Sequence, residues 1–409
     1  MPRGFFCLAT LAAGLMPFLA HAQQDGRPAR GNVQAIAIDP PSSGTSTIHV
    51  VAGNRIFESA NKGSTWTATA NSGLTGRGTI SGFPLAIDPH NSATIYAGTN
   101  GGIFKTSDDG ANWAAINRGL PGRKISCAAP PRAPGPDTNA LAIAIDPSNS
   151  ATIYAVVSSA TVGAASGLGS IFKSTDGGAN WASASSGLTN TFAETLAIDP
   201  TNPSTLYAGT VPGGIFKSTD GGASWNSVNF TTVSTDISAL VVDPVKAGTI
   251  YAVARNTVIQ RSCPKGVSLQ GTDSGIFKTT NGGESWVAVN SGLPTFTGII
   301  SSALAIDPVN SNILYTALIG TGTAGVFKTT DGGANWVAAS SGLTVDPSLG
   351  PLGPAVLAVD PANPATVFAG TFGSGVFKST DSAASWSDIT SNLTAADVGS
   401  LIVNPGNGK

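Results

Sequence analysis

Hydrophobic residues recur along this chain in short runs that are separated by small polar residues. The runs belong to a unit that occurs seven times. In its cleanest copies, one half of the unit reads Leu-Ala-Ile-Asp-Pro, a polar turn and Thr-Ile-Tyr-Ala-Gly-Thr. The other half reads Ile-Phe-Lys-Ser-Thr-Asp-Gly-Gly-Ala-Asn-Trp. Short apolar runs bounded by turn residues are typical of β-strands, and such a period predicts a propeller or another repeat fold.

Two residues keep a fixed place in every unit. The tryptophan that ends the second half lies nine residues after an aromatic residue, and no tryptophan occurs elsewhere. The tryptophans are Trp66, Trp113, Trp181, Trp225, Trp286, Trp336 and Trp386. The aspartates of the Asp-Pro step are Asp39, Asp88, Asp146, Asp199, Asp243, Asp307 and Asp360. In six units an aromatic residue follows this aspartate by eight residues, whereas His49 follows Asp39 by ten.

Each unit predicts four strands, which we name A to D in chain order. Strand A ends at Asp-Pro, strand B contains Ile-Tyr-Ala-Gly-Thr, and strand C contains Ile-Phe-Lys. Strand D begins at the tryptophan and ends near Ser-Gly-Leu. Strands A and B are apolar on both faces, as inner strands between neighbouring sheets are, whereas strand D alternates with small polar residues like an outer strand. We therefore expect an all-β chain that forms one seven-bladed β-propeller of four-stranded antiparallel blades over residues 33–405.

The two ends of this region both contain a strand that could complete the first blade and close the ring. Residues 399–405 form an eighth copy of strand A, after which no second half follows. This copy could join the first blade beside the amino-terminal strand, Val33–Ile38, or displace it. The sequence alone does not decide between these arrangements.

The turn between strands C and D contains an Asp or Asn followed by small residues. Such a side chain can accept backbone N–H bonds from two residues on, and glycine adopts a positive φ without a Cβ clash. The turn residues are Asp108, Asp176, Asp220, Asp331, Asp381, Asn61 and Asn281. The last copy has Ser382-Ala383-Ala384 in place of the glycines, so we expect a distorted turn there.

This Ser/Thr-x-Asp-x-Gly-x-x-Trp pattern resembles the Asp-box, or BNR repeat. The repeat occurs in sialidases, xyloglucan-degrading enzymes, sortilin-like receptors and photosystem II assembly-factor propellers. The resemblance covers nearly the whole chain and implies the propeller fold, with each box acting as a structural turn. It implies no particular activity, because these families perform unrelated functions on one scaffold.

The amino terminus is predicted to be a signal peptide, residues 1–22. Arg3 precedes an apolar run from Phe5 to Met16, and Ala20-His21-Ala22 has the small-x-small pattern of a cleavage site. Residues 23–32 are then a short polar linker, and the mature chain is expected to be secreted or periplasmic. No later stretch has the roughly 18 apolar residues of a membrane helix. A formal net charge of −2 argues against nucleic acid as the partner.

The lengths of the connections distinguish the two ends of the predicted propeller. The A–B and C–D turns are nearly constant, and in an up-and-down sheet they lie at one end. The B–C and D–A loops lie at the other end and vary: the strand B aromatic precedes the tryptophan by 17 residues in the second unit and by 35 in the fifth. Insertions confined to one end favour that end as the binding face.

The two longest loops of that face are basic. The candidate binding residues are Arg118, Arg123, Lys124 and Arg132 in residues 118–140, and Arg255, Arg261 and Lys265 in residues 254–274. They favour an anionic ligand; alternatively, they only keep two long loops soluble. Cys127 and Cys263 lie in the same two loops, and in an oxidising compartment a disulfide between them is a plausible hypothesis.

Evidence for an enzyme is weaker. Resemblance to sialidases would require a tyrosine nucleophile, but all five tyrosines occupy the strand B position. A glycosidase needs two carboxylates about 5 Å or roughly 6.5–9.5 Å apart. The acidic loop residues are Asp137, Glu194, Asp236, Asp273, Asp346 and Asp397, and none stands in a recognisable catalytic motif. The xyloglucan-degrading relatives form a cleft between two such propellers, whereas this chain has one.

The sequence contains few residues suited to metal binding, to nucleophilic catalysis or to cofactor binding. His49 and His90 are the histidines beyond the signal peptide, which argues against a histidine metal site and a Ser-His-Asp arrangement, and no phosphate-binding loop or cofactor motif occurs. We therefore expect an exported, monomeric, non-enzymatic propeller that binds a protein or polysaccharide partner. The alternative is a glycoside hydrolase that uses a carboxylate pair on the same face.

Overall fold

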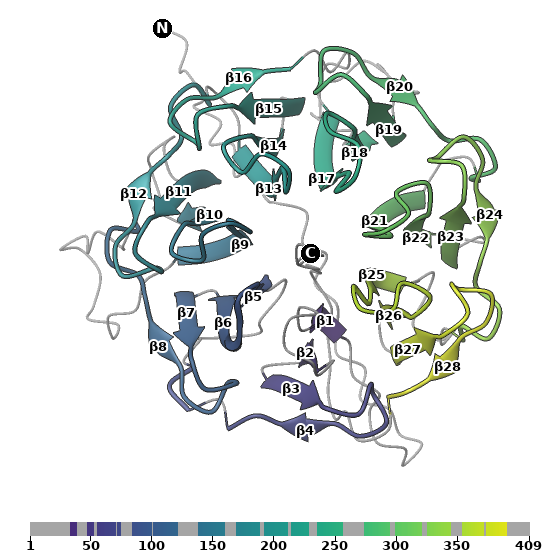
Figure 1. Cartoon of the computed structure of the whole chain (residues 1–409), viewed down its shortest axis with the longest axis horizontal. Helices are drawn as coiled ribbons and strands as arrows, with labels where there is room; N and C mark the ends of the chain where they lie inside the picture. The colour runs from purple at the N-terminus through teal and green to yellow at the C-terminus, as the bar shows by residue number, and fades with distance from the viewer. Residues whose placement is uncertain are drawn as a thin grey trace, which may run out of the picture.

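Seven four-stranded antiparallel sheets surround a common centre and form a seven-bladed β-propeller, which confirms the predicted fold (Figure 1). The computed structural model describes residues 33–38, 47–52, 55–70, 72–74, 84–99, 101–121, 138–159, 169–188, 192–211, 214–228, 235–256, 274–294, 299–320, 325–344, 354–371 and 374–390. Within these ranges every regular element is a strand.

The blades follow the chain in order, and each consists of four consecutive strands. Blade 1 contains β1 (Val33–Ile38), β2 (Ile48–Ala52), β3 (Arg55–Ser59) and β4 (Thr67–Ala68). Blade 2 contains β5 (Leu85–Asp88), β6 (Asn91–Thr99), β7 (Gly102–Thr106) and β8 (Ala114–Ala115). Blade 3 contains β9 (Thr138–Ile145), β10 (Ile153–Ser159), β11 (Ser170–Ser174) and β12 (Ala182–Ser183). Blade 4 contains β13 (Phe192–Ile198), β14 (Leu206–Val211), β15 (Gly214–Ser218) and β16 (Asn226–Ser227).

The remaining three blades repeat this arrangement. Blade 5 contains β17 (Thr235–Val242), β18 (Ile250–Asn256), β19 (Gly275–Thr279) and β20 (Val287–Ala288). Blade 6 contains β21 (Ile299–Ile306), β22 (Leu314–Gly320), β23 (Gly325–Thr329) and β24 (Val337–Ala338). Blade 7 contains β25 (Pro354–Val359), β26 (Val367–Thr371), β27 (Gly375–Ser379) and β28 (Ser387–Asp388). In every blade the first strand lies nearest the centre of the ring and the fourth at its rim (Figure 1).

The outermost strands are shorter than the sequence pattern predicted. Each has two residues and begins one residue after the tryptophan. The Ser-Gly-Leu segment that follows leaves the sheet, because its carbonyl groups bond to the next blade. Trp225 N–H, for example, donates to the carbonyl of Ser186 at 2.8 Å, and Trp181 N–H donates to that of Arg118 at 2.9 Å.

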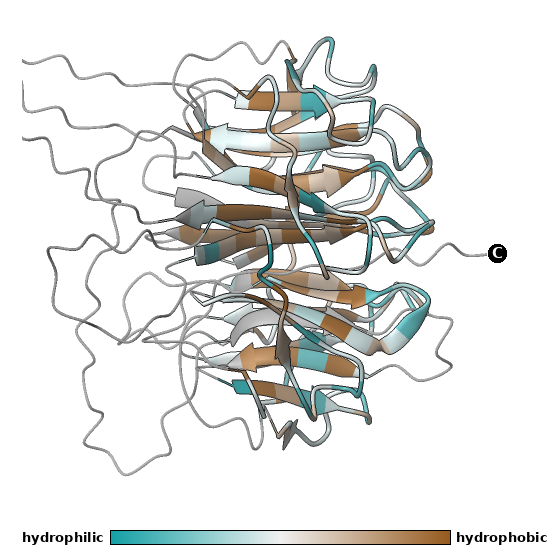
Figure 2. Cartoon of the chain, turned by 90° about the vertical axis from the view of Figure 1, so that its left-hand side faces the viewer, coloured by the Kyte–Doolittle hydropathy of each residue, from teal (hydrophilic) through white to brown (hydrophobic). Residues whose placement is uncertain are grey.

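Apolar side chains fill the spaces between neighbouring blades. One cluster joins Val51 and Ile56 of blade 1 to Leu85 and Ile95 of blade 2, and equivalent clusters occupy the other interfaces. The strands carry most of the apolar residues, whereas the turns are polar (Figure 2). The B strands are buried as predicted, but six of the seven residues of β13 are only half-buried because this A strand borders the centre of the ring.

The turn between strands C and D is held by a fixed set of hydrogen bonds. In blade 3, Ser174 Oγ donates to Asp176 Oδ1 at 2.8 Å, and Asn180 N–H donates to the same oxygen at 2.9 Å. Gly178 N–H donates to Ser174 Oγ at 2.8 Å. The predicted bond from two residues on is therefore wrong: the carboxylate spans the whole turn and accepts from the fourth residue.

The turn of blade 7 is not distorted, contrary to the expectation from its missing glycines. Ser385 N–H donates to Asp381 Oδ1 at 2.9 Å, and Ala383 N–H donates to Ser379 Oγ at 2.8 Å. Ser382 and Ala383 adopt φ values of 58° and 67°, in the same left-handed region as the glycines of the other turns. The side-chain hydrogen bonds thus enforce a left-handed backbone even where glycine is absent.

These bonds make the turn carboxylates strongly acidic. The side-chain amide of Asn180, followed by its backbone N–H and the Ser174 hydroxyl, lowers the pKa of Asp176 to about 2. The pKa values of Asp108, Asp220, Asp331 and Asp381 are also lowered to about 2. An aspartate whose pKa is lower in the folded state contributes stability above its unfolded pKa and loses it as the pH falls through the folded value.

We therefore expect the thermal midpoint to fall between about pH 4 and pH 2, where these five carboxylates become protonated. Melting curves at pH 5, 3 and 2 measure the change. The Asp176→Asn variant keeps an acceptor, as Asn281 does in blade 5, and should show a smaller acid loss than the wild type. An equal loss in the two proteins would assign the acid sensitivity to other groups.

Two side-chain bridges join consecutive blades. In the first, the indole N–H of a tryptophan donates to a carbonyl of the preceding blade. The pairs are Trp66–Ile389, Trp181–Ile116, Trp225–Ala184, Trp336–Val289 and Trp386–Ala339, at 2.7–2.8 Å. In the second, a strand C lysine lies over the strand B aromatic ring of its own blade and donates to a turn carbonyl of the next blade. Lys173 Nζ, for example, lies 5.2 Å from the Tyr154 ring centre and 2.8 Å from Gly221 O.

The ring closes between blades 7 and 1 through both kinds of bridge. Trp66 Nε1 donates to Ile389 O at 2.8 Å, and Lys378 Nζ donates to Lys62 O at 3.0 Å. The amino-terminal strand β1 holds the innermost place of blade 1, where it pairs with β2. The eighth copy of strand A, residues 399–405, lies outside the described residues.

Candidate functional site

The A–B and C–D turns form one end of the propeller, which we call the turn face. In the described A–B turns, those of blades 2 to 7, the aspartate of the Asp-Pro step accepts a backbone N–H from two residues on. Asp199 Oδ1 accepts Thr201 N–H at 2.9 Å, and Asp307 Oδ1 accepts Val309 N–H at 2.9 Å. The B–C and D–A connections leave the opposite end, which we call the loop face. The uniform turns account for the residues of the turn face without a ligand.

A β-bulge recurs near the loop face in the innermost strand of six blades. In blade 4, Ala193 pairs with Thr210 and Thr195 with Gly209, so that Glu194 is the extra residue. The bulged residues are Gln34, Leu141, Glu194, Ser238, Ser302 and Ala355. Each lies five residues before the aspartate of its Asp-Pro step. Bulges re-aim side chains and are enriched beside functional sites.

These bulges surround the loop-face end of the ring centre with five different residue types in six blades. Glu194 is the charged member of the set, and its side chain is half-buried. Asp236, also half-buried, lies two residues before the bulge of the neighbouring strand β17. Because β13 and β17 pack side by side, two of the predicted acidic residues lie on adjacent inner strands. Apolar periodicity does not predict the bulges, because they arise from the pairing between strands.

The other predicted binding residues are only partly placed. Arg118 is exposed at the end of blade 2, where its carbonyl accepts Trp181 N–H. Arg255 lies on β18 directly opposite Asp236. The remaining candidates, which are Arg123, Lys124, Arg132, Arg261, Lys265, Cys127, Cys263, Asp137, Asp273, Asp346 and Asp397, lie outside the described residues.

A serine, a histidine and an aspartate meet on the turn face between blades 2 and 3. Ser150 Oγ donates to Asp88 Oδ1, which also accepts His90 N–H at 2.8 Å. His90 Nδ1 lies 3.0 Å from Ser150 Oγ. In a nucleophilic triad the imidazole takes the serine proton and the carboxylate orients the imidazole. Here the serine proton points to the carboxylate, so the cluster joins two blades and does not form a nucleophile.

The tyrosines are core residues and not nucleophiles. All five are at most 1 % exposed. Burial, reinforced by the charge of Asp199, raises the pKa of Tyr207 to about 12, and burial likewise raises the pKa of Tyr154 to about 12. A nucleophile requires a lowered pKa or an adjacent base. A sialidase-type tyrosine nucleophile is therefore absent among the described residues, all five tyrosines included.

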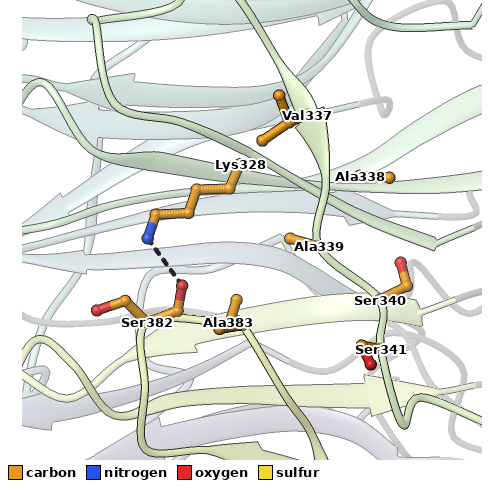
Figure 3. Close-up of a pocket in the computed structure, with 9 residues that line it drawn as sticks. Lys328, Val337, Ala338, Ala339, Ser340, Ser341, Ser382 and Ala383 are labelled. Carbon is orange, nitrogen blue, oxygen red and sulfur yellow. Dashed lines mark hydrogen bonds between the residues drawn. The ribbon is translucent and has the colours of Figure 1, made fainter.

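A shallow cavity of about 200 Å³ lies at the rim between β24 and the C–D turn of blade 7 (Figure 3). Its walls are small side chains, with the hydroxyl groups of Ser340 and Ser341 among them. Lys328 provides the charged group, but its Nζ already donates to Ser382 O at 2.9 Å. The cavity thus lacks a free acid, base or nucleophile and offers no catalytic arrangement.

The described ranges also lack a metal-binding cluster and a membrane-spanning helix. They contain no group of three or more His, Cys, Asp or Glu side chains that could hold a metal ion. They also contain no helix with the length and apolar character required to span a bilayer.

Part of the chain is similar to a known receptor family. Residues 169–298 match the family described as Sortilin-Vps10: Sortilin, neurotensin receptor 3. No curated protein is significantly similar to the chain.

Solved structures of two kinds share the fold. The GH74 enzyme of Niastella koreensis is 19% identical with a TM-score of 0.59, over 88% of this chain and 54% of the enzyme. YCF48 from Cyanidioschyzon merolae is 14% identical with a TM-score of 0.54, over 86% of this chain and 97% of YCF48. A structure of YCF48 bound to D1 peptide is 15% identical with a TM-score of 0.52, over 86% and 94% of the two chains.

These similarities support the resemblance to the sialidase, sortilin and YCF48 propellers at the level of the fold. The chain spans about half the length of the GH74 structure from Niastella koreensis. Because an enzyme and a YCF48 propeller match comparably well, the comparisons favour neither an enzymatic nor a binding role.

Proposed function

We propose that this chain is an exported propeller that binds a protein or glycan partner through its loop face. The observation that carries the proposal is the difference between the two ends of the blades. The turn face repeats the same capping bonds from blade to blade. The loop face has connections of unequal length and a ring of bulged residues with five different residue types in six blades.

Two further observations support a binding role. YCF48, a propeller of the same fold, has been solved with a bound peptide. The basic residues of the 118–140 and 254–274 segments, with Arg118 exposed at the end of blade 2, would attract an anionic partner. Export is part of the proposal and rests on residues 1–22. A cleaved amino terminus beginning at Gln23, found by mass spectrometry of the protein from its native source, would support it.

The experiment is an affinity pull-down from the native envelope, with protein and carbohydrate analysis of the eluate. The test variant carries Arg123, Arg132, Arg255 and Arg261 changed to Ala. The control variant carries Lys62→Ala and Lys246→Ala, which remove two exposed basic side chains from the turn face. We expect the test variant to lose most of the recovered partner and the control to retain it. Equal recovery with all three proteins would remove the basic residues from the site.

A second candidate function is glycoside hydrolysis on the same face. The placement of Glu194 and Asp236 on adjacent inner strands favours it, since glycosidases act through two carboxylates. A polysaccharide panel scored for release of reducing ends tests this candidate. Activity that disappears in both Glu194→Gln and Asp236→Asn would establish it, whereas no release on any substrate would leave the binding role alone.

A further inference from the structure

The interface between blades 1 and 2 differs from the other six interfaces. A strand C lysine reaches the turn of the following blade in every case except this one. The donors and acceptors are Lys105–Gly177, Lys173–Gly221, Lys217–Gly282, Lys278–Gly332, Lys328–Ser382 and Lys378–Lys62. All six ammonium groups lie 5.2–5.9 Å from the ring centre of the strand B aromatic residue.

In blade 1 a histidine and a glutamate replace the aromatic residue and the lysine. His49 and Glu58 are directly opposite each other on β2 and β3, as Tyr154 and Lys173 are on β10 and β11. An ionised carboxylate only accepts hydrogen bonds, so Glu58 cannot donate to a turn carbonyl of blade 2. Its carboxylate has no hydrogen bond or ion pair among the described residues.

The tryptophan bridge that is present at five of the other interfaces is also missing here. Trp113 Nε1 donates at 3.1 Å to Gly110 O, which belongs to its own turn. The residue of blade 1 that follows strand D is Thr69, where blades 2 and 7 have Ile116 and Ile389. The Thr69 hydroxyl bonds within blade 1, to Ile56 O at 3.1 Å. Two independent bridges are therefore absent at one interface.

The closing interface between blades 7 and 1 shows the opposite pattern. Blade 1 is the first and blade 7 the last of the described blades along the chain, yet both the Trp66 and the Lys378 bridges join them. Blade 1 is consequently bridged to blade 7 and lacks these bridges to blade 2. A hydrogen bond from a charged donor shifts an opening equilibrium by roughly tenfold or more, so the difference between the interfaces is substantial.

We propose that the ring opens between blades 1 and 2, and that blade 1 moves with blade 7 when it does. This conformational seam is independent of the identity of the partner. It differs from the expectation that a ring parts where its two chain ends meet. Opening would expose the apolar cluster of Val51, Ile56, Leu85 and Ile95, which is now buried.

Thiol labelling of buried cysteines tests the proposal in the full-length chain. Ile95, Ile153 and Ile48 are fully buried at equivalent places, in the clusters of the 1–2, 2–3 and 7–1 interfaces. Each is changed to Cys in a separate protein, and iodoacetamide labelling under native conditions is followed by peptide mass spectrometry, so that Cys127 and Cys263 remain in place. We expect the Ile95→Cys thiol to react at least tenfold faster than the other two.

A restoring substitution distinguishes a seam from a local packing defect. Adding His49→Tyr and Glu58→Lys to the Ile95→Cys protein supplies the missing bridge and should slow its labelling roughly tenfold. The same pair should leave labelling of the Ile153→Cys thiol unchanged. If Ile95→Cys fails to fold, Val51→Cys probes the same cluster from blade 1. Equal rates at the three interfaces, or fastest labelling of the Ile48→Cys thiol, would overturn the proposal.

Discussion

Replacing Gly292 with alanine is expected to destabilise the propeller by about 3 kcal/mol or more. Gly292 follows strand D of blade 5 with φ +83°, and a Cβ there would overlap the carbonyl oxygen of Trp336 in blade 6. The clash involves two backbones, which a rotamer change cannot relieve. Denaturant unfolding measures the loss.

A matched glycine separates this clash from ordinary backbone strain. Gly221 also has a positive φ, +66°, but its Cβ would meet the flexible end of Lys173, 3.1 Å away. We expect Gly221→Ala to cost only about 1 kcal/mol. Similar losses in the two variants would mean that the close approach of the blades is not what requires glycine at position 292.

The second large effect is expected at Trp225, which is 2% exposed. Trp225→Ala should cost about 3–5 kcal/mol, because it removes a buried aromatic ring from the cluster between blades 3 and 4. Trp225→Phe keeps most of the packing but removes the bond from Nε1 to Ala184 O at 2.7 Å, at a cost of about 1 kcal/mol.

Trp113→Phe is the control for the bridging role, since the Trp113 indole bonds to its own turn. Thermal unfolding compares the wild type with the Trp225→Ala, Trp225→Phe and Trp113→Phe variants. If Trp113→Phe and Trp225→Phe lower the midpoint equally, the bond between blades adds nothing beyond the turn bond. A larger loss for Trp225→Phe supports the bridge.

The fold was predictable from the sequence because each blade repeats the same chemistry at fixed spacing. The strand B tyrosines and the turn residue Asp176 have the core and turn roles expected of them. The sequence predicts too long a strand D, because it does not show that the Ser186 carbonyl bonds to Trp225 of the next blade. The turn of blade 7 was misjudged for a related reason, since the Asp381 and Ser379 bonds compensate for the missing glycines.

The candidate site was less predictable, since it depends on the register between strands and on contacts between distant residues. The bulge at Glu194 arises from the pairing of β13 with β14, which apolar periodicity does not reveal. The contact between Ser150 and Asp88 joins residues 62 positions apart. The departure of blade 1 at His49 and Glu58 was visible in the sequence, but its meaning required the lysine bridges of the other blades.

The central claim is that partners bind the loop face and not the turn face. Site-specific photo-crosslinking tests it most directly, with probes placed near both ends of the innermost strands of blades 4 and 5. Positions 194 and 236 lie near the loop face of blades 4 and 5, and the exposed positions 201 and 245 lie on the turn face of the same blades. We predict adducts with the native partner from positions 194 and 236 and none from 201 and 245. Adducts from the turn-face positions alone would contradict the claim.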